Sequence, residues 1–234
     1  MPGRKSALIA SATLLLAVLV LLAGPLVKGG ILPWQLGLGL FAIGSLVAAI
    51  GGLICLIIVI RNRGGKLASA GMVAGLMAAM ILIRIVTGSS GVPRIHDITT
   101  DTANPPQFVS VTAALRGLGS NSIAYDPAVA PQQAAAYPAI RPRLIARPPA
   151  EVFDSVTKAI VARGWTVVGA DSATGRIEAT DTSGWWGFKD DIVVRLRPEG
   201  TGTRIDVRSV SRVGQSDLGA NAARIEKLLD SVSG

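Results

Sequence analysis

The first ninety residues lack acidic side chains altogether. Residues 1–90 contain seven Lys or Arg and no Asp or Glu, whereas residues 91–234 contain sixteen basic and fifteen acidic side chains. The formal net charge of +8 therefore belongs to the N-terminal part, and the remainder is nearly neutral. That remainder has no basic stripe with interleaved aromatic residues, so we expect no nucleic-acid partner.

Cysteine and histidine are almost absent. The single cysteine, Cys55, excludes an intrachain disulfide and a multi-cysteine metal site. The single histidine, His96, precedes Asp97 and Asp101. In an extended chain these carboxylates stand about 13 Å apart at ~3.3 Å per residue, which is too far for one metal ion. We therefore expect neither a metal ion nor another cofactor.

Three long apolar stretches without acidic residues cover residues 7–27, 34–60 and 67–87. Each is long enough to cross a hydrocarbon core of roughly 30 Å at 1.5 Å per residue. The first stretch exceeds the apolar core of a secretory signal peptide, and two more stretches follow it, so it predicts an uncleaved anchor. The sequence predicts a three-helix transmembrane domain over residues 1–90, with the lipid bilayer as its first partner.

Basic residues beside the spans predict the orientation. Two precede the first span and three lie in the connection at 61–66, whereas the connection at 28–33 has one. Because basic flanks stay on the cytoplasmic side, we expect a cytoplasmic N-terminus and an exported C-terminal part. The excess of arginine, 17 Arg to 6 Lys, together with many alanines, is typical of a GC-rich bacterial genome. We therefore expect a multi-pass inner-membrane protein with a periplasmic domain.

The second and third spans are joined by a short connection and carry matching small residues. These recur every four positions: Gly44, Ala48 and Gly52 on one span, and Gly71, Gly75 and Ala79 on the other. Small residues let helix backbones approach closely in lipid. The pattern predicts an antiparallel hairpin, and homodimerisation through the same faces is the alternative.

Residues 143–234 show the pattern of an α+β domain. Amphipathic helices are predicted at the start, over PPAEVFDSVTKAIVARG, and at the end, from about Asp217 to Val232, with apolar positions three and four apart. Between them lie four alternating, β-branched segments at 165–171, 175–181, 191–197 and 203–210, separated by turn residues. A fifth strand is expected around Leu144. The predicted fold is thus membrane α-helical, followed by a four- to five-stranded antiparallel sheet with two helices.

Residues 91–142 contain scattered proline, alanine and serine with no sustained period, yet they carry several large apolar side chains. This number of apolar anchors disfavours disorder. We expect an extended segment that wraps against the domain and contains short pieces of regular structure.

Two polar stretches stand out, RIHDITTDTANPPQF at 94–108 and DVRSVSRVGQSDLGANAARI at 206–225. The candidate polar site drawn from them comprises His96, Asp97, Asp101, Arg208, Ser209, Ser211, Arg212 and Asp217. A strand that leads into a helix beside two arginines is one way to bind an anion. The other interpretation is that Arg208 or Arg212 pairs with Asp97 or Asp101 and fastens the wrapping segment.

The two stretches resemble the family called domain of unknown function 1499, including membrane-anchored bacterial members, over about residues 91–232. The resemblance implies an envelope location and a shared domain, and it implies no reaction.

Adjacent tryptophans, Trp185 and Trp186, cannot both face one core from a strand, so they form a candidate interface with the bilayer or with a partner. A bulged loop that folds both side chains inward is the alternative.

Three functions are consistent with the sequence. The first is a non-enzymatic membrane protein whose exported domain binds an envelope protein or lipid. The second is a hydrolase or transferase that uses His96 with an aspartate. The third is a carrier of lipid or another small ligand with an apolar pocket between sheet and helices.

Overall fold

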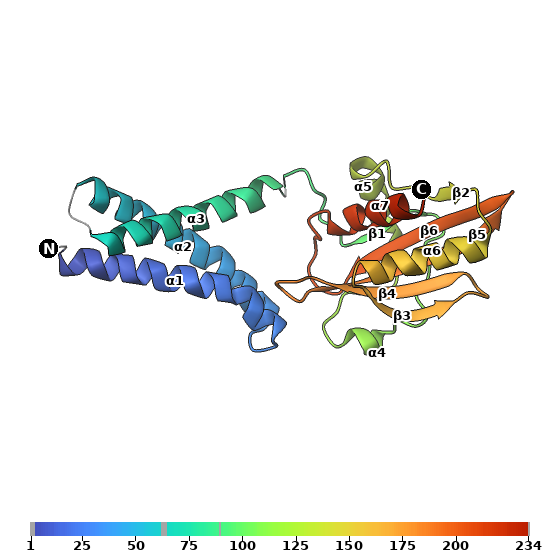
Figure 1. The fold of residues 1–234 in the computed structure, drawn as a ribbon, viewed down its shortest axis with the longest axis horizontal. Helices are drawn as coiled ribbons and strands as arrows, with labels where there is room; N and C mark the ends of the chain where they lie inside the picture. The colour runs from blue at the N-terminus through green and yellow to red at the C-terminus, as the bar shows by residue number, and fades with distance from the viewer. Residues whose placement is uncertain (1–2, 62–64, 89, 234) are drawn as a thin grey trace. The chain divides into compact units, whose positions relative to one another are not determined.

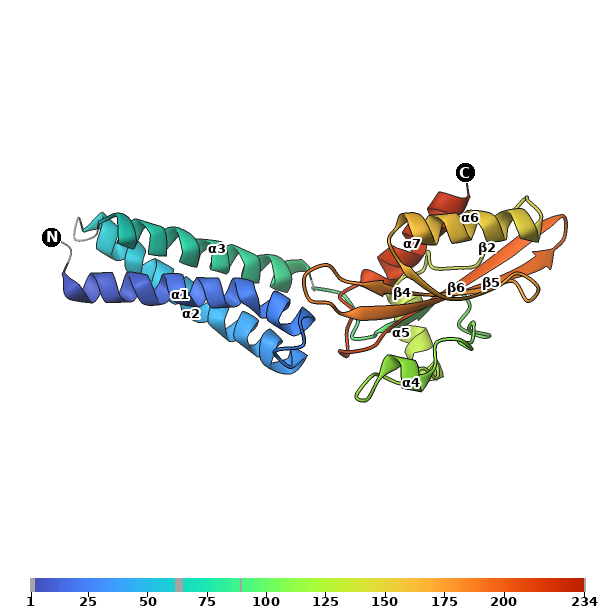
Figure 2. The same ribbon diagram turned by 60° about the horizontal axis from the view of Figure 1, so that its bottom comes forward.

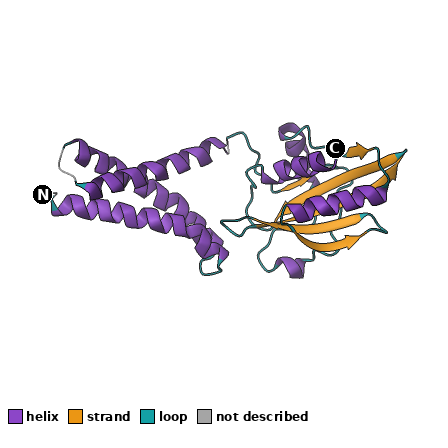
Figure 3. Ribbon diagram, viewed as in Figure 1, coloured by secondary structure: helices purple, strands orange, loops and turns teal. Residues whose placement is uncertain are grey.

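The computed structural model describes residues 3–61, 65–88 and 90–233. The chain forms two compact units, one of residues 1–90 with 184–187 and one of residues 91–183 with 188–234. Figure 3 shows long helices joined by short connections in the described part of residues 1–90, and every described strand lies in the second unit.

The first unit contains three helices, α1 (Arg4–Lys28), α2 (Trp34–Ile60) and α3 (Lys66–Gly88). All three are long and apolar enough to cross a membrane, by length and composition. The three predicted helices are therefore confirmed. Arg63, one of the basic residues used to predict the orientation, lies outside the described residues.

The backbones of α2 and α3 approach closely where small residues face each other. A side-chain carbon added to Gly52 would stand 2.6 Å from the Cα of Gly75. Real carbon atoms do not come this close, so any larger residue at Gly52 would force the helices apart. The predicted hairpin packing is confirmed at Gly52 and Gly75, whereas Gly44, which the prediction placed at the same contact, faces Val20 of α1.

The second unit is built on one antiparallel sheet of six strands (Figure 1). In chain order the strands are β1 (Asp97–Thr99), β2 (Arg143–Ile145), β3 (Thr166–Asp171), β4 (Arg176–Thr182), β5 (Lys189–Glu199) and β6 (Gly202–Ser211). The order across the sheet is β1-β6-β5-β4-β3, and β2 also pairs with β6. The prediction counted four or five strands because β1, with only three residues, has no alternating pattern of its own.

Two amphipathic helices, α6 (Pro149–Ala162) and α7 (Ala220–Val232), lie on the same face of the sheet (Figure 2). They bury an apolar core whose larger members include Ile98, Val156, Ile177, Ile192, Val194, Ile205, Val207, Ile225 and Leu229. Helix α7 begins three residues later than its predicted start at Asp217. Leu218 and Gly219 both adopt positive φ angles, of 53° and 84°, which no α-helix contains.

The opposite face of the sheet is covered by part of residues 100–142, a segment that includes α4 (Ala113–Arg116), the 3-10 turn η1 (Pro127–Val129) and α5 (Ala130–Ala136) (Figure 2). Gln133 of α5 bonds the backbone of Thr99 at the edge of β1, and Ile140 packs into the core on the helix-covered side. These short pieces of regular structure lie within residues 91–142, the range predicted as a wrapping segment. We call residues 100–142 the wrap.

The wrap changes the character of the sheet. Alternating strands predict a half-buried sheet whose polar side chains face water. Instead β6 is buried along nearly its whole length, and its charged residues Asp206 and Arg208 are fully buried. For β6 the expectation of a half-buried strand is therefore wrong, because the wrap covers its second face, whereas β3 has only exposed and half-buried positions.

Candidate functional site

The two signature stretches meet where β1 pairs with β6. Asp97 lies opposite Val210, and Thr99 lies opposite Arg208. Asp97 accepts two hydrogen bonds from the guanidinium of Arg208, at 2.9 Å from Nε and 2.7 Å from Nη2. The predicted ion pair between the signatures is confirmed, and its two-point geometry is the strong form of such a pair.

Arg208 is fully buried, and several groups surround its guanidinium. Its guanidinium lies 5.4 Å from the ring centres of both Phe108 and Tyr125. It also donates to the carbonyl oxygen of Ile123 at 2.8 Å. Burial raises the pKa of the Tyr125 phenol, and the charge of Asp97 adds to this effect. The guanidinium of Arg208 is therefore already bound by the carboxylate of Asp97 and by the rings of Phe108 and Tyr125.

A second arginine of the signature, Arg212, binds an acid that the sequence did not single out. Asp191 on β5 is fully buried and accepts from Arg212 Nε at 2.9 Å and from Nη2 at 2.8 Å. Arg116 of the wrap also pairs with Asp191, at 3.0 Å. Burial lowers the pKa of Arg116, although the charge of Asp191 acts against this. Two arginines thus share one buried carboxylate.

The wrap itself supplies ligands for a third acid, Glu178 on β4. The backbone N–H groups of Val109, Ser110 and Val111 donate to its carboxylate at 2.7–3.1 Å. Successive N–H groups that converge in this way form an anion-binding concavity, and here a fully buried side chain fills it. Arg176 contacts the same carboxylate at 3.2 Å.

Asp101, the other signature aspartate, belongs to a more open cluster at the start of β6. Its carboxylate lies 3.1 Å from Arg204 and 3.4 Å from Arg195. Both arginines also bind Asp206, together with Arg197 at 2.8 Å. Asp97 and Asp101 therefore bind different arginines.

The serines of the second signature lie on the opposite face of the sheet from its arginines, because successive side chains alternate along a strand. Ser209 donates to Asn221 Oδ1 at 2.6 Å, and Asn221 Nδ2 donates to Ser211 at 3.0 Å. Asp217 accepts from the backbone N–H groups of Gly219 and Asn221 at 2.9 and 2.8 Å, which anchors the start of α7. Burial raises the pKa of Asp217.

His96 is half-buried, and only its backbone takes part in the hydrogen bonds that the structure describes for it. Its carbonyl oxygen accepts from the N–H of Ser211 and from Asn221 Nδ2. Within residues 3–61, 65–88 and 90–233, no group of three His, Cys, Asp or Glu side chains is placed to hold a metal ion.

Trp185 and Trp186 belong by their contacts to the first unit. Their ring centres are 5.0 Å apart in an edge-to-face arrangement, and each lies 5.5 Å from the ring of Phe41. Trp185 remains 38% exposed. Their role as an interface stays a prediction.

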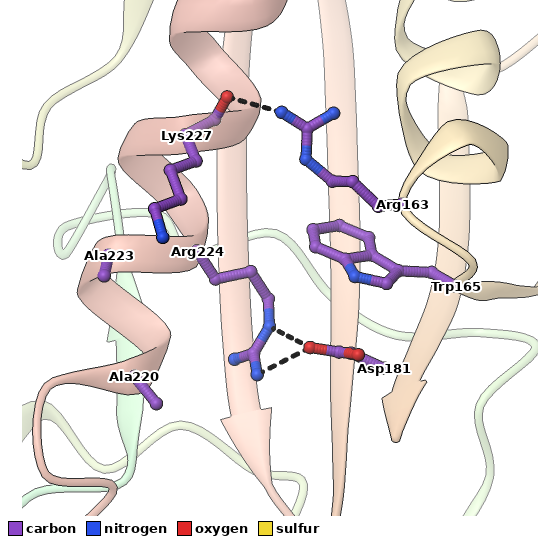
Figure 4. Close-up of a pocket in the computed structure, with 7 residues that line it drawn as sticks. All are labelled: Arg163, Trp165, Asp181, Ala220, Ala223, Arg224 and Lys227. Atoms are coloured by element: carbon purple, nitrogen blue, oxygen red, sulfur yellow. Dashed lines mark hydrogen bonds and ion pairs between the residues drawn. The ribbon is translucent and has the colours of Figure 1, made fainter. Parts of the chain in front are cut away.

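A surface groove of about 450 Å³ lies on the helix-covered side of the sheet. Seven residues line it (Figure 4): Arg163, Trp165, Asp181, Ala220, Ala223, Arg224 and Lys227. The sequence analysis missed this groove because its residues come from three segments that are far apart in the sequence.

The buried acids also escaped prediction, although the sequence carries a signal for them. Ile192, Val193 and Val194 form an apolar run, and a run of this kind indicates a strand buried on both faces. Asp191 and Glu178 occupy the face shared by Val193, where an acid requires a partner.

The second unit is thus an α+β domain. Its sheet is covered by two helices on one face and by the wrap on the other, and buried acids and arginines bind the wrap to the sheet. Residues 97–232 match the family described as protein of unknown function, DUF1499. The match covers more than half of the chain, and the chain belongs to this family. Among curated proteins, no sequence matches the chain.

Proposed function

We propose that this chain is a multi-pass protein of a bacterial inner membrane whose α+β domain is periplasmic and binds a component of the envelope. The distribution of basic residues beside the spans supports the orientation. The long apolar helices support the membrane location.

One observation carries the binding function in preference to catalysis. Both aspartates of the first signature are bound by arginine, Asp97 by Arg208 of the second signature and Asp101 by Arg204, which lies just before it. The negative charge of each carboxylate is already balanced by an arginine, and Asp97 is also buried. The signature therefore serves as the scaffold that closes the domain, and ligand binding falls to the open surface.

The two alternatives lack a supporting contact. A hydrolase would need His96 within hydrogen-bond reach of an acid or a nucleophile, and the described contacts of His96 are made by its backbone. A lipid carrier would need an enclosed apolar pocket. Two cavities of this unit are open surface grooves with charged walls, one at Arg163 and Lys227 and one at Arg176 and Arg195, and neither supports the carrier function.

A reporter fused to the C-terminus tests the location. We expect a periplasm-dependent reporter such as alkaline phosphatase to be active and a cytoplasm-dependent fluorescent reporter to be dark. The opposite pair of results would overturn the proposal.

Native mass spectrometry of the full chain, extracted from membranes in mild detergent, tests binding against catalysis. We expect wild type and His96→Ala to retain the same envelope component. A hydrolase or transferase would instead accumulate, in His96→Ala only, a substrate that the wild type does not hold.

A further inference from the structure

The groove beside α7 has one wall of small residues. Ala220, Ala223, Arg224 and Lys227 lie three, four and seven positions apart, so they form one stripe on the helix. The two alanines leave space between α7 and Trp165, which stands at the opposite wall (Figure 4). A volume of about 450 Å³ suits a small molecule or a lipid headgroup.

Arginine and lysine dominate the lining, but they are not equally available. Arg224 already binds Asp181 at 2.9 Å and Asp190 at 2.6 Å. Lys227 is exposed and makes no side-chain hydrogen bond or ion pair in the part of the chain that the structure describes. The charge available at this wall is therefore the ammonium group of Lys227.

Arg163 adds a second cation with spare donors. Its guanidinium donates to the carbonyl oxygens of Ala159 at 2.9 Å and Lys227 at 2.7 Å, and it lies 5.9 Å from the ring centre of Trp165. These two bonds use two of the five N–H groups that a guanidinium carries. The bond to Lys227 holds Arg163 against the backbone of the residue that bears the available ammonium (Figure 4).

We propose that this groove binds a phosphate ester, with the phosphate held by Lys227 and Arg163 and the rest of the molecule lying on Trp165 and the two alanines. Lysine supplies a point charge and arginine a fork of donors, and both are favoured phosphate ligands. The proposal rests on the proposed function, because it names the class of envelope component that the exported domain binds. The phosphate belongs either to a lipid headgroup or to a soluble ester.

Calorimetric titration of sn-glycerol 3-phosphate into the full chain tests this site. The chain is held in micelles of dodecyl maltoside, which contain no phosphate, and we compare wild type with Lys227→Glu and with Lys158→Glu. Lys158 is an exposed lysine of α6 that does not line the groove, so its variant carries the same change of charge elsewhere. We expect Lys227→Glu to weaken binding at least about tenfold and Lys158→Glu to leave it unchanged, because a hydrogen bond to a charged group is lost only in the first variant.

A repeat in dodecyl maltoside micelles that also contain phosphatidylglycerol separates the two sources of phosphate. If the lipid headgroup is the ligand, it competes and the apparent affinity for glycerol phosphate falls in wild type. If a soluble ester is the ligand, the affinity is the same with and without the lipid. Both results support a phosphate site, whereas absent binding, or equal affinity in wild type and Lys227→Glu, overturns it. The reporter test of location is independent of this titration, so failure of the site leaves the proposed function standing.

Discussion

The two faces of the sheet in the second unit differ in how they are closed. On one face α6 and α7 bury aliphatic side chains such as Ile192 and Val207. On the other face the wrap, which has little regular structure, is held by Glu178, Asp191 and Arg208. An irregular segment cannot present a continuous apolar stripe. Directional contacts between charged groups and backbone replace it here.

This difference shows how an irregular segment acquires a single position. Apolar contacts tolerate small shifts between packed surfaces, whereas a carboxylate bound at two points fixes its partner. A buried ion pair adds little net stability compared with a well-packed apolar pair, but loss of one partner is costly. We therefore expect the faces to respond differently to the same kind of substitution.

The largest loss of folding stability is expected when one partner of the buried pair between Asp97 and Arg208 is removed. Asp97→Ala leaves the guanidinium of Arg208 buried without its carboxylate, which costs roughly 3–5 kcal/mol of folding free energy. Pulse proteolysis in urea of the full chain in detergent micelles measures this loss, because cleavage reports the unfolded population.

The exposed pair between Arg143 and Asp230 is the matched control. It has the same chemistry and a similar distance of 2.8 Å, but its side chains are 36% and 70% exposed. Asp230→Ala should cost only about 0–1 kcal/mol. Equal losses for Asp97→Ala and Asp230→Ala would mean that burial by the wrap has no energetic consequence.

A pair of valine substitutions compares the faces directly. Val207 lies on the apolar face and Val210 on the polar face, and both are fully buried. Val207→Thr places a hydroxyl among aliphatic groups at a cost of about 1–3 kcal/mol. We expect Val210→Thr to cost less, because it lies between the partner strands' Asp97 and Asp191 and gains an acceptor. The same urea titration ranks the two variants, and a larger loss for Val210→Thr would contradict the comparison.

A smaller effect is expected at the end of the apolar face, where Asp181 and Asp190 lie directly opposite each other on β4 and β5. Arg224 binds both carboxylates, at 2.9 and 2.6 Å. Arg224→Met leaves two facing like charges, which costs about 1 kcal/mol at low salt. Because salt screens partly exposed charges, 1 M sodium chloride should recover part of this loss. A loss that does not change with salt would rule out repulsion as its cause.

The smallest effect is a pH dependence at Asp217. Burial raises the pKa of Asp217 above its ordinary value of 3.8, so the folded state holds the proton more tightly than the unfolded state. The contribution of Asp217 to stability is thus greatest below pH 3.8 and falls as pH rises through the raised pKa. Asp217→Asn does not titrate.

Stability measured against pH for both proteins isolates this group. The free energy of unfolding of wild type minus that of Asp217→Asn should decrease as pH rises above 3.8. A difference that stays constant or increases with pH would exclude the raised pKa.

Local patterns predicted the helices and long strands, because the apolar periodicity of each of these elements lies within its own sequence. The pair between Asp97 and Arg208 was also accessible, since both residues stand in conspicuous polar stretches. Arg116 and Glu178 were not, because their partners depend on the path of an irregular segment that has no period. Lys227 and Arg163 were missed for a similar reason, because only the folded chain brings them to one groove.

Hydrogen exchange of the full chain in detergent micelles tests the central claim that the wrap is part of the folded domain. The decisive amides are those of residues 109–111, which donate to the buried carboxylate of Glu178. We expect them to be protected to the same free energy as the amides of β6, and Glu178→Gln to lower that protection. Exchange of residues 109–111 at the rate of an unstructured peptide, while β6 stays protected, would contradict the account.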